Sequence, residues 1–388
     1  MRDANCDLVL ALLERGGAQT RAELARVTSL TPQALGSILG ELVDEGLVVA
    51  LEPEINGRGR PSSAYCIDAD ASFWVGASVQ WRSVFVAVSD AAGDIRARAQ
   101  FPHDGSSMES LLSELADQAT DLVASVDPTG ARLCAAGLSV QGLVDPATGR
   151  VVDAVAWPDR DVDARAAFEA LTGWPTHLDS AARATARAEV LRSTEPRGLV
   201  AVLYFSHDPY LVLVHGGEVL GGRHGTGGEL AHLPIPGATS RCTCGRRGCM
   251  STVVSGSALV ERYVRESGRP ARAVPDVIAA ARLGDDVAKV ALDEFGRVAA
   301  QMTTLLVPYL DPSLLIVSGL VGGPDSRGAV RLVEQIREGL RHEQADLEVV
   351  ISPLGRDAHA WGALTLARQE RGLRSSVPAG VVRALAPG

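Results

Sequence analysis

The sequence predicts an α/β protein that begins with a winged helix-turn-helix module. Residues 1–66 read as three short amphipathic helices followed by two β-rich segments. From Phe73 onward, apolar β-rich runs alternate with helical stretches, a pattern typical of mixed sheets covered by helices and compatible with two lobes. One histidine and three cysteines at residues 232–249 add a candidate metal site to this second part of the chain.

Apolar spacing and capping residues predict the first two helices. The first covers Asn5–Arg15 and is closed by a glycine pair at positions 16 and 17. The second begins with the capping-box pair Thr20 and Glu23 and ends near Val27. These are the first two helices of the predicted module.

The third helix and a hairpin complete the module. The helix begins at Thr31, whose side chain is the expected N-cap, and runs to Gly46. Two β-rich segments follow, Leu47–Leu51 and Tyr65–Ile67, on either side of the turn-prone loop Gly57–Pro61. In a winged helix-turn-helix this order makes the third helix the recognition helix and the loop the wing.

DNA contacts are expected from the recognition helix and from the wing. The recognition helix reaches base edges in the major groove, and the wing contacts phosphates or the minor groove. Glu41 is a further exposed position expected on the helix. The candidate DNA-binding residues lie at the start of the third helix and in the wing: Thr31, Gln33, Ala34, Ser37, Arg58 and Arg60.

The charge of this module is poor for a DNA binder. Residues 1–66 hold six arginines and nine acidic side chains, a balance of −3, and the whole chain carries a formal net charge of −10. DNA affinity comes largely from neutralised phosphates, so we expect modest affinity and strong salt dependence. An interaction module that never touches DNA is the alternative. The net charge also argues against broad, nonspecific polyanion binding.

Composition describes an ordinary globular protein. The chain has 388 residues, 46% hydrophobic and 22% charged, which is enough for two or three domains with substantial cores. Its longest apolar runs, such as Leu199–Phe205 and Leu211–Val214, have the length of strands and are far too short to span a membrane. The segment Met1–Arg15 does not resemble a signal peptide, so we expect a cytoplasmic protein.

The second part of the chain reads as alternating strands and helices. Four strands are predicted from apolar, β-rich runs: Trp74–Val79, Val84–Asp90, Leu133–Val140 and Leu314–Val317. Four helices are predicted from helical periodicity: Met108–Ala124, Val162–Leu171, Ala182–Leu191 and Ala258–Arg265.

The histidine and cysteine cluster predicts a structural zinc site. His232, Cys242, Cys244 and Cys249 are four ligands suited to a closed tetrahedral site, which leaves no position for water or substrate. The glycines at positions 245 and 248 allow the tight turns that such a site needs. The alternative is that these cysteines are disulfides or small buried residues. Half of the six cysteines in the chain lie here, which favours zinc.

The zinc segment resembles that of a known family. The run GGELAHLPI at Gly227–Ile235, followed by CTCGRRGCM at Cys242–Met250, is similar to the zinc segment of the ROK (repressor, open reading frame, kinase) family. This family contains sugar kinases and sugar-responsive regulators. Its repressors, unlike its kinases, carry an N-terminal module similar to the one predicted here.

The resemblance implies a domain organisation. It covers about residues 3–370 and implies a bilobal domain similar to actin and hexokinase. We therefore expect a winged helix-turn-helix domain over residues 1–68, a ROK domain over residues 72–370 and a flexible tail over residues 371–388.

Two loops differ from those of the ROK kinases. Kinases of this fold hold ATP phosphates through the backbone of two glycine-rich hairpins. This chain has Ser78–Arg82 at the first position, with the bulky Trp81 where close approach needs glycine. It has Ser206–Tyr210 at the second position. We therefore expect both phosphate loops to be lost.

The catalytic aspartate of the ROK kinases is also expected to be replaced in this chain. The resemblance places it in an Asn-Asp pair that precedes a helix glutamate by eight residues. Glu189 fits that glutamate, and counting back puts Ser180 and Ala181 at the pair. A rival alignment makes Asp179 the catalytic aspartate, but it requires two extra residues in the helix. We favour Ala181, which cannot accept a proton, and expect no kinase activity.

The resemblance further implies a sugar-contacting role for Glu229 and His232. Other positions that contact sugar in the family have changed. Ala154 stands where an asparagine is usual, and Gln141–Asp145 replaces a proline-glycine loop. We expect a pocket that binds an altered sugar, another small molecule or nothing.

The favoured interpretation is a ROK-type transcriptional regulator, a repressor of carbohydrate-related genes. It would bind an inverted-repeat DNA operator as a homodimer or dimer of dimers, with structural Zn²⁺ and a sugar or other small-molecule effector. The alternatives are an ATP-dependent sugar kinase, and a zinc-stabilised scaffold that binds neither DNA nor sugar.

Overall fold

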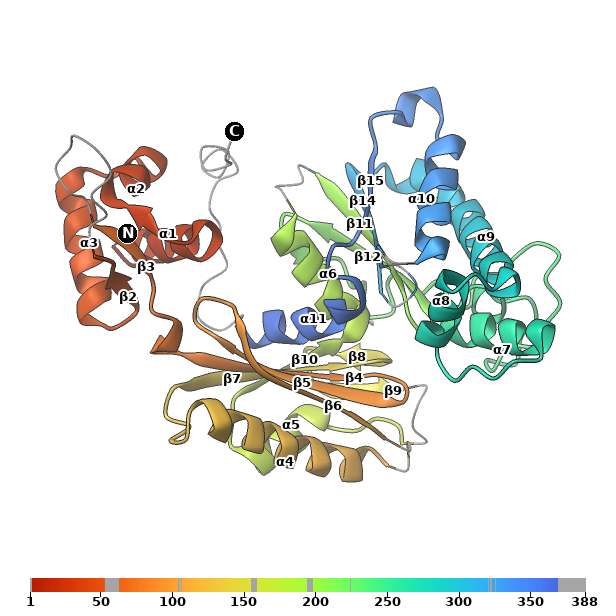
Figure 1. The fold of residues 1–388 in the computed structure, drawn as a ribbon, viewed down its shortest axis with the longest axis horizontal. Helices are drawn as coiled ribbons and strands as arrows, with labels where there is room; N and C mark the ends of the chain where they lie inside the picture. Colours follow the sequence, from red (N-terminus) through yellow and green to blue (C-terminus); the bar gives the residue numbers. More distant parts are fainter. Residues whose placement is uncertain are drawn as a thin grey trace.

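The computed structural model of this chain describes residues 2–52, 63–103, 105, 107–154, 159–193, 198–223, 225–319, 321, 323–324 and 326–368. An N-terminal helical unit is followed by two five-stranded sheets, each with its own helices (Figure 1). The expected wing residues Arg58 and Arg60, and the expected tail over 371–388, lie outside the described residues. The α/β class and the mixed sheets agree with the prediction.

The N-terminal unit consists of three helices and a small antiparallel sheet. Its elements are α1 (Arg2–Gly16), β1 (Gln19–Thr20), α2 (Arg21–Thr28), α3 (Pro32–Asp44), β2 (Val48–Ala50) and β3 (Ala64–Ile67). The strands pair in the order β1-β3-β2. The unit has a core of its own, to which all three helices contribute: Val9, Leu12, Leu13, Leu24, Leu35, Leu39 and Leu42. The helices follow the prediction, whereas the short strand β1 was not predicted.

Side-chain caps fix where α2 and α3 begin. Thr20 Oγ1 accepts the backbone N–H of Glu23 at 3.3 Å, and the Glu23 carboxylate accepts that of Thr20 at 2.7 Å. Thr31 Oγ1 accepts the backbone N–H of Ala34 at 3.2 Å. Between the two helices Ser29 adopts a left-handed φ of 56°. These local interactions define the turn between α2 and α3.

The first lobe is built on a sheet with the order β10-β7-β4-β5-β6. Strands β10, β7 and β4 run parallel, while β4, β5 and β6 are antiparallel. The strands are β4 (Phe73–Val79), β5 (Ser83–Asp90), β6 (Ile95–Pro102), β7 (Leu133–Val140) and β10 (Thr176–Ser180). The helices α4 (Met108–Val126) and α5 (Ala164–Thr172) cover its outer face, and β8 (Leu143–Asp145) pairs with β9 (Arg150–Asp153) (Figure 1).

The helix predicted from Val162 begins two residues later. Val162 forms a β-bridge with Val151, and the Asp163 carboxylate accepts the backbone N–H of Ala166 at 3.1 Å. Because Asp163 is the N-cap, the first helical residue is Ala164.

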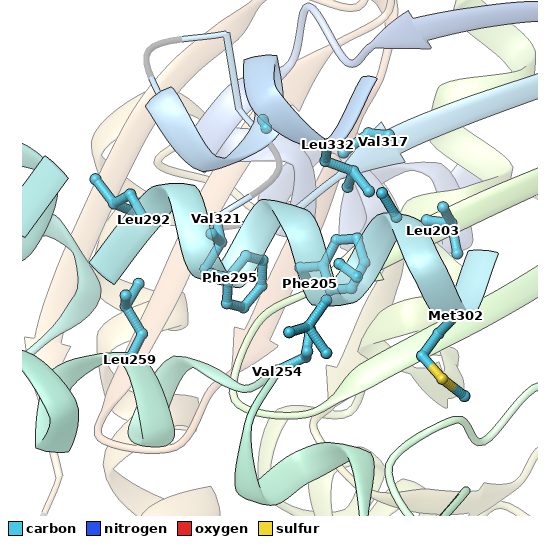
Figure 2. Packing of buried hydrophobic residues seen from close by; sticks show 14 of the residues in the cluster. Leu203, Phe205, Val254, Leu259, Leu292, Phe295, Met302, Val317, Val321 and Leu332 are labelled. Carbon is cyan, nitrogen blue, oxygen red and sulfur yellow. The ribbon is translucent and has the colours of Figure 1, made fainter. Parts of the chain in front are cut away.

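The second lobe contains a sheet with the order β13-β12-β11-β14-β15. Its strands are β11 (Leu199–Phe205), β12 (Pro209–His215), β13 (Glu218–Val219), β14 (Leu314–Ser318) and β15 (Glu348–Ile351). Its helices are α7 (Gly256–Ser267), α8 (Val274–Arg282), α9 (Asp286–Leu310) and α10 (Arg327–Gly339). They enclose a core in which Phe205 and Phe295 pack edge to face, with ring centroids 5.4 Å apart, beside Val254 and Leu259 (Figure 2).

Two helices, α6 (Ala181–Arg192) and α11 (Ala358–Ala367), lie between the two sheets (Figure 1). Helix α6 packs on the second sheet, where Ala182 and Ala186 contact buried valines of β11 and β12. Helix α11 packs on the first sheet and against α6. Together they connect the two lobes.

Helix α11 meets its neighbours backbone to backbone at three glycines. A Cβ at Gly76 of β4 would lie 2.6 Å from a backbone nitrogen of α11, and one at Gly137 of β7 would lie 2.0 Å from an α11 carbonyl oxygen. A Cβ at Gly362 of α11 would lie 2.6 Å from a backbone nitrogen of α6. Only glycine permits these approaches, so α11 has no clearance on either side.

A buried glutamate fixes α6 on the second lobe. Glu189 is 2% exposed, and its Oε1 accepts the hydroxyls of Ser318 at 2.6 Å and Ser352 at 2.5 Å. Burial raises the pKa of this carboxyl, and the two serine hydrogen bonds partly oppose that rise. The contact joins α6 to the ends of β14 and β15.

No helix among the described residues is long and apolar enough to cross a membrane.

Replacing Gly137 with alanine tests the close contact of α11 with the sheet. The added Cβ would overlap an α11 carbonyl at 2.0 Å, so we expect Gly137→Ala to lower the free energy of unfolding by about 3 kcal/mol. Gly40→Ala is the matched control, because no atom lies within 4 Å of a Cβ there. In helix α3 this change should stabilise by up to about 1 kcal/mol. Equal urea midpoints for both variants would contradict the claim that α11 packs against β7 without space for a side chain.

Candidate metal centre and ligand-binding residues

The four residues predicted to bind zinc lie together. The ligand atoms of His232, Cys242, Cys244 and Cys249 are all within 4.8 Å of one another. The Cys242 Sγ to His232 Nδ1 distance is 3.5 Å, and the Cys244 Sγ to Cys249 Sγ distance is 3.6 Å. Tetrahedral zinc geometry places such nitrogen–sulfur and sulfur–sulfur pairs about 3.5 and about 3.8 Å apart. All three cysteines are free thiols, so the group fits a zinc ion better than a disulfide.

Backbone turns bring these ligands together. Gly248 has a φ of 71°, and a Cβ there would lie 2.3 Å from the carbonyl oxygen of Ala238. Gly245 has a φ of 87° and donates its N–H to the Cys242 carbonyl at 3.0 Å. The segment is held at its end by Met250, which is fully buried in the second-lobe core. The two glycines are therefore required by backbone conformation, as predicted from the sequence.

The second nitrogen of His232 faces a carboxylate. His232 Nε2 lies 3.9 Å from Glu229 Oε1, while Nδ1 is directed to the cysteine group. Metal-binding histidines commonly have a carboxylate partner on the other ring nitrogen, which fixes the tautomer. Glu229 is positioned by a β-bridge to Tyr210, beside Gly228, where a Cβ would lie 1.7 Å from a β12 carbonyl oxygen. The two expected effector contacts are thus neighbours, and one of them also faces the metal group.

The two loops at the expected phosphate positions touch each other. Trp81 follows β4 in the first lobe, and His207 follows β11 in the second. Their ring centroids are 3.5 Å apart at an interplanar angle of 61°. The backbone N–H of Trp81 donates to Gln141 Oε1 at 2.8 Å, which holds the loop on the end of β7. Two aromatic rings therefore meet across the lobes.

Burial shifts the pKa values of two side chains in the second loop, His207 and Asp208. Burial lowers the pKa of His207 to about 4, so its ring is neutral at pH 7. Burial raises the pKa of Asp208 to about 6, with a further rise from Glu229 and an opposing effect of His232. At neutral pH the loop presents a carboxylate near Glu229 and no cation. Such a surface repels phosphate groups.

Ala181 and Asp179 are the two residues that the sequence analysis aligned with the catalytic aspartate of the ROK kinases. Ala181 is the first residue of α6 and is buried, with Ser180 as its N-cap. Asp179 lies in β10, and its carboxylate accepts the guanidinium of Arg183 at 2.5 Å and that of Arg187 at 3.3 Å. Both oxygens of this carboxylate are therefore engaged by side chains of α6.

Arg183, which the sequence reasoning missed, bridges the two lobes. Beyond Asp179, its guanidinium donates to the carbonyl of Val144 at 2.6 Å and to the carbonyl of Gly225 at 2.7 Å. It is 5% exposed. Val144 belongs to β8 of the first lobe, while Gly225 belongs to the loop that leads to Glu229. One of three arginines in an alanine-rich helix, Arg183 gave no sequence signal for this role.

The expected DNA-contacting positions of α3 are accessible. Thr31, Gln33 and Ser37 are exposed and Ala34 is half-buried. Glu41, expected on the same exposed face, instead lines a cavity between α3 and the first lobe.

The two-sheet fold, the central helices and the Cys₃His group together define a class of protein. The ROK family model matches residues 82–370, so this chain belongs to the ROK family. It is 22% identical over 385 residues to the DNA-binding transcriptional dual regulator NagC of Escherichia coli K12, covering 95% of this chain and 93% of that protein.

Solved structures show the same fold. A ROK family transcriptional regulator, described as a homologue of the E. coli MLC protein, matches with a TM-score of 0.73 and 22% identity. The match covers 100% of this chain and 99% of the regulator. A ROK glucokinase from Streptomyces griseus, solved with glucose and AMPPNP, matches with a TM-score of 0.64 and 23% identity over 77% of this chain and 100% of its own.

Replacing one metal ligand tests the zinc prediction. We expect Cys244→Ser to release zinc and to loosen residues 232–255, because metal binding is coupled to local folding. Zinc content by mass spectrometry should fall from about one ion per chain to near zero. Cys134→Ser is the matched control, since this free thiol lies in β7, far from the group in sequence. Native protein purified without chelator that holds no zinc would contradict the assignment.

Proposed function

We propose that this chain is a DNA-binding transcriptional regulator that responds to a small molecule and does not transfer phosphate. Its N-terminal unit would read an inverted-repeat operator, as a homodimer or dimer of dimers. Its ROK domain would bind zinc and a sugar or similar effector. The observation that carries the proposal is the full-length similarity to a named DNA-binding regulator.

That similarity extends into the N-terminal unit. A match over 95% of the chain must include most of the segment from Met1 to Cys66, which precedes the residues matched by the family model. The unit has the element order of a winged helix-turn-helix, and α3 presents Gln33 and Ser37 to solvent. We propose Thr31, Gln33, Ala34 and Ser37 as the groove-facing residues, with Arg58 and Arg60 in the wing.

Three features of the ROK domain argue against phosphoryl transfer. The rings of Trp81 and His207 meet where backbone N–H groups would have to hold phosphates. Asp208 adds negative charge at the same loop. Ala181 supplies no base, and Asp179 is held by two arginines.

Zinc has a structural role in this proposal. His232, Cys242, Cys244 and Cys249 would hold the ion in a closed site, so it supplies cross-linking of the loop and no catalysis. The ion would fix the ring of His232 and, through it, the position of Glu229. These two residues are the proposed effector contacts.

Selection of bound fragments from sheared genomic DNA tests the DNA-binding function. The purified protein is incubated with the fragments at near-physiological salt, and the retained DNA is sequenced. The proposal predicts recovery of a shared inverted repeat. Recovery of nothing above background by folded, zinc-loaded protein would favour a scaffold that binds neither DNA nor sugar.

Two substitutions separate positioning contacts from sequence-reading contacts. We expect Arg60→Ala to weaken binding to all fragments and to lower the salt slope by about one unit, because one phosphate contact is lost. We expect Gln33→Ala to relax the preference at one base pair, by about 1–3 kcal/mol. Titrations at several salt concentrations measure both effects. An unchanged slope for Arg60→Ala would exclude the wing from the contact surface.

A further inference from the structure

The side chain of Arg368 joins α11 to the N-terminal unit. Arg368 is the C-cap of α11, and its guanidinium forms an ion pair with Glu14 of α1. The same group donates to the carbonyls of Asp90 at 3.1 Å and Ala91 at 3.0 Å. Its Cζ lies 4.6 Å from the centroid of the Trp74 ring. One side chain therefore contacts α11, the first sheet and α1.

The junction around this contact is only partly filled by side chains. A cavity of about 240 Å³ lies between the N-terminal unit and the first lobe. Apolar side chains from both sides line it, among them Leu10, Leu42, Ile67 and Trp74, together with the acidic side chains Asp7, Glu14, Glu41 and Glu45. A cavity of this size means that apolar packing restrains the unit less than a filled core would. Beside this cavity Ile67 packs on the cluster of Trp74 and Ala91, so the orientation of α1–α3 rests on this small apolar contact together with the polar contacts of Arg368.

The other end of the connection is rigid. Helix α11 meets α6 at Gly362 without clearance, and Arg192 of α6 stacks on Trp361 of α11 with its Cζ 3.8 Å from the ring centroid. At the start of α6, Arg183 binds the carbonyl of Gly225, in the loop that leads to Glu229. A continuous chain of contacts thus runs from the proposed effector loop through α6 and α11 to Arg368 and Glu14.

We propose that Arg368 is a positioning residue that sets the orientation of the DNA-reading unit on the first lobe and links it to α11. The proposal rests on the proposed function, because orientation matters only if α1–α3 reads DNA. Two reading units bind an inverted repeat together only when their spacing and rotation match the half-sites. A shift of α11 by a small distance would move Glu14 and α1 with it.

The test compares Arg368→Gln, Glu14→Gln and the double variant with the wild-type protein. The matched control is Arg262→Gln, which removes a 3.1 Å ion pair with Glu266 on α7, remote from the junction. Affinity is measured for a fragment retained in the selection described above. Hydrogen exchange by mass spectrometry is measured in parallel for α1, for residues 64–72 and for β11.

Each single variant is expected to bind the fragment about 10-fold more weakly than wild type, with no further loss in the double variant. Exchange should accelerate in α1 and residues 64–72 and stay unchanged in β11. Arg262→Gln should change neither. Faster exchange throughout the chain would reduce Arg368 to a general stabilising role and overturn the proposal. Unchanged exchange at the junction, or unchanged affinity with altered exchange, would also overturn it.

The two readouts keep this inference separate from the proposed function. If wild-type protein retains no DNA, the function fails, and the exchange data alone decide whether Arg368 holds the N-terminal unit in place. If DNA is retained and only the coupling fails, the function stands without Arg368 as its positioning residue.

Discussion

Helix α11 is the element on which the rest of the structure depends. It lies between the two sheets and touches β4, β7 and α6 through glycines that leave no space for a side chain. The first sheet packs directly on this short, alanine-rich and leucine-rich helix, and the second sheet packs on it through α6. If the two lobes move relative to each other, α11 must either move with one of them or shift against its neighbours. Since close-packed interfaces shift between discrete arrangements rather than deforming smoothly, this helix is suited to transmit a change in lobe angle.

The residues around the proposed effector loop show how a kinase fold can serve regulation. Phosphoryl transfer needs open backbone loops for phosphate and a free carboxylate as base. Here aromatic rings meet between the loops, and Asp179 forms ion pairs with two arginines. What remains beside these loops is a glutamate, a histidine and a Cys₃His group that could hold a metal ion. We therefore propose that this chain retains the ROK fold without phosphoryl transfer.

The parts of this account that the sequence predicted are local ones. The predicted zinc ligands all lie between His232 and Cys249, and the capping residues of α2 and α3 act over three positions, so spacing alone was enough to predict both groups. Helices α8–α11 and strands β6, β10 and β15 were not predicted. Strand β6 alternates half-buried and exposed residues at a sheet edge, but alanine, a poor strand former, occupies two of its four half-buried positions. Long-range contacts were beyond reach: Arg368 and Glu14 are 354 positions apart, and nothing local marks either residue.

The most direct measurement of the central claim is a coupled assay of ADP release with purified, zinc-loaded protein, ATP and Mg²⁺, across hexoses and amino sugars. A ROK sugar kinase assayed in parallel serves as the positive control. The account predicts that sugars add nothing to the rate of ADP formation seen without them. Sugar-dependent turnover at ordinary kinase rates, about 1–100 s⁻¹, would contradict the account and show that this chain is a ROK sugar kinase.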